Sequence, residues 1–358
     1  MSEHTPSQPL RFSAQIPDQT RIIFATVVGD DDVLSTTDWS GLDWRRTLEA
    51  ASHNRVLYVF ANRLLESGAT LPAFARDWLQ LVVQDAQVRF KQFQDTVAYL
   101  GQTLGRDEVP YLVVKTFKYL DYVTFDVDTL VPYDRFDDAI ESLKSGGARI
   151  LPHPRKQGVH QRNCMREGLC NIDLHRKFFW QGLDHIDEDY VWATSAERRI
   201  DGADCRCPAI EVDFLLHNKQ LAYERYYVTI LDFLAVKYAH ERNVLDHDAI
   251  ENQVRRHRWS ASYRSLLGIL NGINHAFYGE PLFAGEPSPC PARLNMPFLY
   301  PYPLVLRQLG EMIGVQRVFP AYDFAYYHFT FMRYLASGRN LLPYYRHWFD
   351  FSKLDGGS

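Results

Sequence analysis

The stretch Val123-Thr-Phe-Asp-Val-Asp-Thr-Leu-Val-Pro132 places two carboxylates inside a short apolar run that ends at a proline. Its β-branched and aromatic residues favour a strand. Because side chains alternate along a strand, Asp126 and Asp128 project from one face, and Phe125 and Val127 project from the other. Two carboxylates side by side repel each other unless a cation lies between them. The stretch therefore predicts a metal site at the edge of a strand, and Mg²⁺, which prefers oxygen ligands, fits it.

Other strand candidates surround this stretch. Tyr111–Val114 is a short apolar run before it, and residues 134–145 after it have the periodicity of a helix. Val159–Met165 and Leu169–Phe179 follow, separated by a glycine that suits a tight turn. These last two segments are predicted to form an antiparallel hairpin.

The second strand of that hairpin offers a third carboxylate. In an extended strand Asn171, Asp173 and His175 share one face. If this strand lies beside residues 123–131, three carboxylates converge, which is enough to hold two magnesium ions and to let Asp173 act on an attacking hydroxyl. The alternative is ordinary, because an Asp-x-Asp pair also occurs as two solvated residues at the end of a strand.

Helical periodicity occupies both sides of the strand-rich segment, which predicts an α+β fold. We expect a small mixed β-sheet flanked by N- and C-terminal helical regions, the last stretch of helix including Tyr322–Tyr334. The predicted boundaries are a flexible arm at 1–20, an N-terminal helical region at 21–108, the core at 109–182 and a C-terminal helical region at 183–358.

Bulk properties exclude several other classes of protein. The chain has 358 residues and a formal charge of −5, which argues against a broad electropositive surface for nucleic acid. It shows no apolar run of roughly 18–20 residues and no signal-peptide pattern at its start, so we expect a cytoplasmic protein with no membrane partner. Cys205-Arg-Cys207 has one intervening residue, short of the usual zinc spacing, and reduced thiols are the better interpretation of the five cysteines.

The motifs together resemble the nucleotidyltransferase superfamily typified by DNA polymerase beta. More narrowly, the chain resembles a poorly characterised bacterial and archaeal nucleotidyltransferase family with Leu-Lys-Gly, Asp-x-Asp-x-Leu-Val and Asp-Leu-His motifs. The corresponding segments are Val114-Lys-Thr116, Asp126-Val-Asp-Thr-Leu-Val131 and Asp173-Leu-His175. The resemblance extends from about residue 38 to residue 259.

The resemblance implies a magnesium-dependent transfer of a nucleoside monophosphate, with AMP the expected group, from a nucleoside triphosphate to a hydroxyl. The implied catalytic and metal-binding residues are Asp126, Asp128 and Asp173. Cofactor-binding residues are expected at Lys115, Thr116 and Lys118, the lysines contacting phosphate by charge and the threonine offering its hydroxyl. The acceptor, which the sequence leaves unidentified, is a small molecule, a protein or an RNA.

Two alternatives stay open. Thr116 stands where the family has the glycine that lets a triphosphate approach the backbone, so a catalytically degenerate binding or regulatory protein is the first. A metal-dependent nuclease is the second, and it is less favoured because Asp173 is not followed by a lysine two positions later. His175 is either a hydrogen-bond partner of Asp173 or a packed or exposed strand histidine, the second being the better interpretation.

Overall fold

The structure is a computed structural model of the whole chain. It describes residues 9–14, 16–117, 120–151, 161–180, 183–184, 186–225, 227–242, 244–284 and 296–300.

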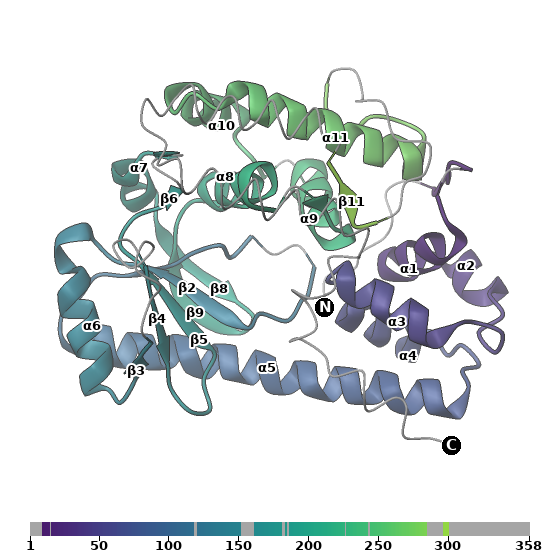
Figure 1. Cartoon of the computed structure of the whole chain (residues 1–358), viewed down its shortest axis with the longest axis horizontal. Helices are drawn as coiled ribbons and strands as arrows, with labels where there is room; N and C mark the ends of the chain where they lie inside the picture. The colour runs from purple at the N-terminus through teal and green to yellow at the C-terminus, as the bar shows by residue number, and fades with distance from the viewer. Residues whose placement is uncertain are drawn as a thin grey trace, which may run out of the picture.

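A five-stranded mixed sheet lies at the centre of the α+β fold predicted from the sequence (Figure 1). Its strand order is β1-β2-β5-β4-β3. The strands are β1 (Leu112–Val113), β2 (Asp126–Leu130), β3 (Arg149–Ile150), β4 (Gln161–Met165) and β5 (Asn171–His175). Strands β2 and β5 are parallel, and every other neighbouring pair in this sheet is antiparallel. The predicted hairpin is therefore confirmed as β4–β5, and its second strand lies beside β2.

The two faces of the sheet differ in chemistry. Val127 is paired with Ile172 in the β2–β5 register, and both are buried in one apolar cluster. Asp128 is paired with Asp173 on the opposite face. The apolar face fixes the register, because a slip by one residue would move the carboxylates into the core. Packing of the apolar face therefore fixes the positions of the carboxylates on the polar face.

The part of the chain that the structure describes contains eleven α-helices. The N-terminal helices are α1 (Asp18–Val28), α2 (Asp31–Thr36), α3 (Trp44–His53), α4 (Leu57–Glu66) and α5 (Ala73–Arg106). Helix α6 (Phe136–Ser145) follows β2, after a short 3₁₀ turn at Tyr133–Arg135. The C-terminal helices are α7 (Glu188–Ala193), α8 (Ile210–Lys219), which continues as a π-helical turn at Gln220–Arg225, α9 (Ile230–Glu241), α10 (His247–Arg256) and α11 (Ser260–Tyr278).

Three small strand pairs complete the described fold. They are β6 (Phe179–Trp180) with β7 (Leu183–Asp184), β8 (Ala196–Ile200) with β9 (Ala203–Cys207), and β10 (Tyr227–Val228) with β11 (Phe298–Leu299), all antiparallel. Among the described helices, none combines the length and the apolar character that crossing a membrane requires.

Two hydrophobic cores form, and α5 belongs to both. Its first half contributes Leu79 and Val82 to a core shared by the N-terminal and C-terminal helices. Its second half contributes Phe93 and Leu100 to a core between the sheet, α6 and β9. At 34 residues the helix is about 51 Å long, and Figure 1 shows it running beneath the sheet and the N-terminal helices alike. The N- and C-terminal helical regions thus pack together as one unit.

Two of the predicted regions contain features beyond those expected. In the segment predicted as an arm, Ile16 is buried in the helical core, Phe12 packs against that core, and the Arg11 amide donates to the Phe277 carbonyl at 2.8 Å. The prolines at the start of the chain indicated an extended arm, but Leu10 and Phe12 between them contact the core. The predicted helical region from 183 also contains the β8–β9 hairpin. The stretch Tyr322–Tyr334 lies outside the described residues.

Candidate active site

The face of the sheet that carries Asp128 and Asp173 forms a cluster of ionisable groups. Oxygen atoms of these two carboxylates and a ring nitrogen of His175 all lie within 4.8 Å of one another. Asp126, two residues before Asp128, projects from the same face of β2. The cluster is assembled by the β2–β5 pairing, which joins residues far apart in sequence.

The acidic groups repel one another at this close range. Burial, together with the charges of Asp128 and Asp126, raises the pKa of Asp173 to about 7. Burial and the charge of Asp128 also raise the pKa of Asp126. Burial opposes ionisation of Asp128 as well, but the neighbouring Lys115 and His175 hold the pKa of that carboxyl well below its usual range. One carboxylate is therefore firmly ionised, and the other two are ready to take up a proton or a cation.

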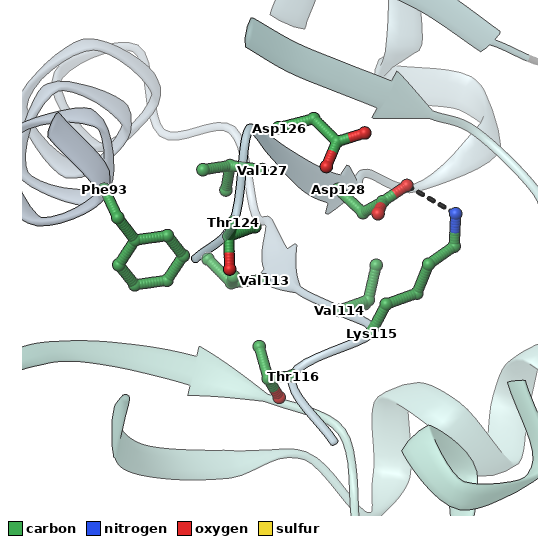
Figure 2. A pocket seen from close by; sticks show the side chains of 9 residues that line it. All are labelled: Phe93, Val113, Val114, Lys115, Thr116, Thr124, Asp126, Val127 and Asp128. Atoms are coloured by element: carbon green, nitrogen blue, oxygen red, sulfur yellow. Dashed lines mark hydrogen bonds and ion pairs between the residues drawn. The ribbon is translucent and has the colours of Figure 1, made fainter. Parts of the chain in front are cut away.

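Lys115 is the predicted cofactor-binding residue that reaches the cluster. Its Nζ lies 2.5 Å from Oδ1 of Asp128 (Figure 2). The backbone of Lys115 has a φ of 57°, in the left-handed region that side chains other than glycine seldom adopt. The side chain of Lys115 points from this backbone toward the carboxylates. A small pocket opens beside the lysine, lined by Phe93, Val113, Val114, Lys115, Thr116, Thr124, Asp126, Val127 and Asp128.

The hydroxyl of Thr116, which was predicted to contact the cofactor, has a partner within the protein. The side chain is 6% exposed, and its hydroxyl donates to Oδ2 of Asp213 at 2.5 Å. Asp213, which is fully buried in the first turn of α8, also accepts from the Lys115 amide at 2.9 Å and from Arg198 at 2.9 Å. These contacts fix the chain after β1. Lys118, the third predicted cofactor-binding residue, lies outside the described part of the chain.

His175 contacts a different carboxylate from the one considered in the sequence analysis. Its Nε2 lies 2.7 Å from Oδ1 of Asp128 rather than bonding to Asp173. Burial lowers the pKa of His175, although the hydrogen bond to Asp128 acts in the opposite direction. A neutral His175 ring that donates its Nε2–H to the Asp128 carboxylate gives both groups a hydrogen-bond partner. The same hydrogen bond fixes the orientation of Asp128.

Several residues of the site have no obvious signal in the sequence. Gln161 of β4 donates to Oδ2 of Asp173 at 3.0 Å. The charge of Lys219, buried at the end of α8, is near enough to lower the pKa of His175. Asp213 is the exception, because an acidic residue inside the apolar run Val212-Asp-Phe-Leu-Leu216 is unusual enough to be noticed.

The donors of the cluster fit a hard divalent cation. Asp126, Asp128 and Asp173 provide carboxylate oxygens, the ligands that Mg²⁺ prefers. Burial, and then the negative charge of the neighbouring carboxylates that Lys115 only partly offsets, raises the pKa values of Asp126 and Asp173. Within the described residues, the group whose ligand atoms lie close enough together to hold a metal ion is Asp128, Asp173 and His175, and Asp126 is not part of that group. Cys205 and Cys207 are buried free thiols with sulfur atoms 3.5 Å apart.

Known proteins provide an independent comparison. The sequence profile of the family described as "uncharacterised nucleotidyltransferase" matches residues 40–273, while no curated protein matches the chain. The solution structure of the antibiotic-resistance factor ANT(2'')-Ia is 12% identical, with a TM-score of 0.34 and a match covering 53% of this chain and 97% of the other. The crystal structure of the lincosamide antibiotic adenylyltransferase LnuA with lincomycin is 15% identical, with a TM-score of 0.27 and coverages of 40% and 94%. The family match confirms the resemblance carried by the motifs: the chain belongs to the uncharacterised nucleotidyltransferase family.

Proposed function

We propose that this protein transfers a nucleoside monophosphate, AMP in the first instance, from a magnesium-bound nucleoside triphosphate to a hydroxyl group. The observation that carries the proposal is the pairing of Asp128 with Asp173 in the β2–β5 register, with Asp126 on the same face of β2. Three carboxylates held on one rigid sheet face provide the arrangement that a phosphoryl-type transfer needs, since such sites act by positioning and charge.

Asp126, Asp128 and Asp173 are the residues that would hold magnesium, as one or two ions. When bound, the metal supplies positive charge against the phosphate oxygens as the transfer proceeds. His175 contributes by orienting Asp128, and Gln161 contributes by orienting Asp173.

Asp173 is suited to accept the proton of the attacking hydroxyl. In the metal-free chain its pKa is raised to about 7 by burial and by the neighbouring carboxylates, and a general base works best when its pKa lies near the working pH. The hydroxyl oxygen forms a bond to the α-phosphorus, the bond from the α-phosphorus to the bridging oxygen breaks, and pyrophosphate leaves. Lys115 is placed to balance the charge of the phosphates as its contact with Asp128 is exchanged for one to the substrate.

Binding of a triphosphate is the first test, because it needs no acceptor. We expect the full chain to bind at least one of ATP, GTP, CTP and UTP in a magnesium-dependent manner by isothermal titration calorimetry. Asp126→Asn with Asp128→Asn should abolish that binding while the circular dichroism spectrum stays unchanged. The matched control is Asp137→Asn with Asp138→Asn, which removes the same charge from the first turn of α6 and should bind normally. Absence of binding by the unaltered protein would refute the proposal.

A second candidate is a nucleotide-binding protein without turnover. It is favoured by Thr116, whose hydroxyl is bonded to Asp213 and which stands in place of a glycine. This candidate predicts magnesium-dependent binding with no release of pyrophosphate for any hydroxyl acceptor. Detection of a covalently nucleotidylated small molecule, protein or RNA would eliminate it.

A further inference from the structure

Two cysteines of the β8–β9 hairpin are in contact with each other. Cys205 and Cys207 both project from the buried face of β9, and their sulfur atoms are 3.5 Å apart. Both belong to the core between the sheet, α5 and α6. Asp204 and Arg206 alternate with them along β9 and are exposed. The thiols are therefore covered by a hairpin whose outer face meets solvent.

The cysteine pair borders the contacts that hold Lys115 in place. Cys205 is paired across the hairpin with Arg198, whose guanidinium hydrogen-bonds the sulfur of Cys207. The same guanidinium donates to Oδ2 of Asp213 at 2.9 Å, and Asp213 accepts from the Lys115 amide at 2.9 Å. Cys207 lies three residues before α8, the helix that carries Asp213. The two thiols thus lie between the strand and the helix that fix the chain after β1.

The two thiols differ in reactivity. The hydrogen bond from Cys205 lowers the pKa of Cys207, and the positive charge of Arg198 lowers it further, against the effect of burial. The same hydrogen bond and burial raise the pKa of Cys205. The thiolate is the nucleophile in cysteine chemistry. Cys207 is therefore the thiol that reacts first, and Cys205 is the thiol that reacts with the product.

We propose that Cys205 and Cys207 form a redox switch, in which oxidation by hydrogen peroxide to a disulfide releases the Lys115 segment from Asp213. The Cys207 thiolate attacks one peroxide oxygen, the O–O bond breaks, and the other oxygen leaves as hydroxide, which takes up the proton that Cys207 had released. The sulfur of Cys205 then attacks the resulting sulfenic acid, the S–OH bond breaks, and water leaves with the proton of Cys205. Two thiols are oxidised, and one peroxide is reduced to two molecules of water.

A disulfide between these residues does not fit an extended strand. Residues two positions apart in a strand are separated by roughly 6.7 Å, whereas the Cβ atoms of a disulfide lie about 4 Å apart. Closing the bond therefore bends β9 and shifts Cys205 against Arg198, its partner in the register. Because Arg198 holds the carboxylate that accepts from the Lys115 amide, this bend loosens the segment after β1. A strained disulfide is also reduced easily, so the change is reversible.

The first readout is chemical. The reduced full chain is treated with hydrogen peroxide, the remaining thiols are alkylated, and the digest is analysed by mass spectrometry. We expect the fragment that contains Cys205 and Cys207 to escape alkylation and to lose the mass of two hydrogen atoms, and dithiothreitol should reverse both changes. Thiols that stay free, or that are oxidised only to sulfinic acid, would overturn the proposal.

The second readout is the backbone amide of Lys115, which needs no nucleotide. In the oxidised chain, hydrogen exchange measured by mass spectrometry should be faster for the peptide that contains Lys115 and Thr116. The physical reason is that the Lys115 amide loses its hydrogen bond to Asp213. Unchanged exchange in a chain that carries the disulfide would overturn the switch.

Two matched variants identify the thiols that respond. Cys205→Ala removes one member of the pair, and its hydrogen exchange should not change with peroxide. Cys164→Ala removes another buried free thiol of the same core, on β4, and it should respond like the unaltered chain. A response to peroxide that persists in Cys205→Ala would overturn the assignment to this pair.

The consequence for the site rests on the proposed nucleotidyl transfer, in which Lys115 contacts the phosphates. Oxidation should raise the Kd for the magnesium-bound triphosphate roughly 10- to 100-fold, the range of a lost charge-assisted hydrogen bond. An unchanged Kd in a chain with faster exchange would overturn the link to the site. Failure of the unaltered, reduced chain to bind any triphosphate would refute the proposed function, whereas the disulfide and exchange readouts would still decide the switch.

Discussion

Replacing Asp173 by asparagine should stabilise the metal-free protein, and the gain should grow with pH. In the folded chain the pKa of Asp173 is raised from 3.8 to about 7. A carboxyl whose pKa is higher in the folded state binds its proton more tightly there than in the unfolded chain. The free energy of unfolding therefore falls as the pH rises from about 4 to about 7, because the unfolded chain releases this proton first. Asparagine has the same shape, can accept the hydrogen bond from Gln161, and carries no charge.

The size of the effect follows from the pKa values. A change from 3.8 to about 7 corresponds to about 4 kcal/mol at high pH. Part of this free energy is already lost at pH 5, because at that pH the carboxyl of Asp173 is largely ionised in the unfolded chain. Between pH 5 and pH 8 the free energy of unfolding of Asp173→Asn, measured relative to the unaltered protein, should therefore increase by about 3 kcal/mol.

The assay is urea unfolding followed by circular dichroism at pH 5 and pH 8, with a chelator present. Asp204→Asn, which removes a solvent-exposed carboxylate that pairs with Arg199 on the β8–β9 hairpin, is the control and should show no such change. Saturating magnesium should reduce the difference at pH 8, because the cation removes the repulsion that the substitution relieves. The reasoning would be refuted by a difference between variant and unaltered protein that is the same at both pH values.

Two further predictions concern the residues that hold the cluster in place. Asp213→Asn should lower the free energy of unfolding by about 3 kcal/mol in urea, because it leaves Arg198 partly buried without its carboxylate; an effect below about 0.5 kcal/mol, the level of an ordinary surface substitution, would contradict that role. His175→Phe should weaken magnesium binding roughly 10- to 100-fold, as measured by magnesium-induced thermal stabilisation, because the hydrogen bond that orients Asp128 is lost. Unchanged magnesium affinity would show that His175 is only packed.

The sheet face of the site could be predicted from the sequence because alternation along a strand is a local rule. Asp126 and Asp173 each stand between two apolar residues, and Asp128 follows Val127, so alternation alone places each carboxylate on the face of its strand opposite those apolar residues. The β4–β5 hairpin followed from its glycine turn. The pairing of Asp128 with Asp173 was stated only as a condition, since the parallel contact between β2 and β5 joins strands separated by a helix and two further strands.

The parts that the sequence did not predict depend on contacts between distant segments. Lys115 has a positive φ although it is not a glycine, so the backbone conformation beside its contact with Asp128 has no local signal. The hydroxyl of Thr116 was expected to face a phosphate, because nothing near it in sequence indicates that Asp213 lies 97 positions later in hydrogen-bond range. The β8–β9 hairpin was the avoidable omission, since Ala203, Cys205 and Cys207 alternate with charged residues as a strand should.

Helix α5 has a consequence for how the molecule unfolds. Its first half is packed in the helical core, and its second half is packed under the sheet. Separating the two cores would require this continuous helix to break in its middle or to expose one apolar face along half its length. The helical regions and the sheet should therefore melt in a single cooperative transition, with equal calorimetric and van't Hoff enthalpies. The same helix then sets the spacing between the N-terminal helical region and the strands that carry the carboxylates.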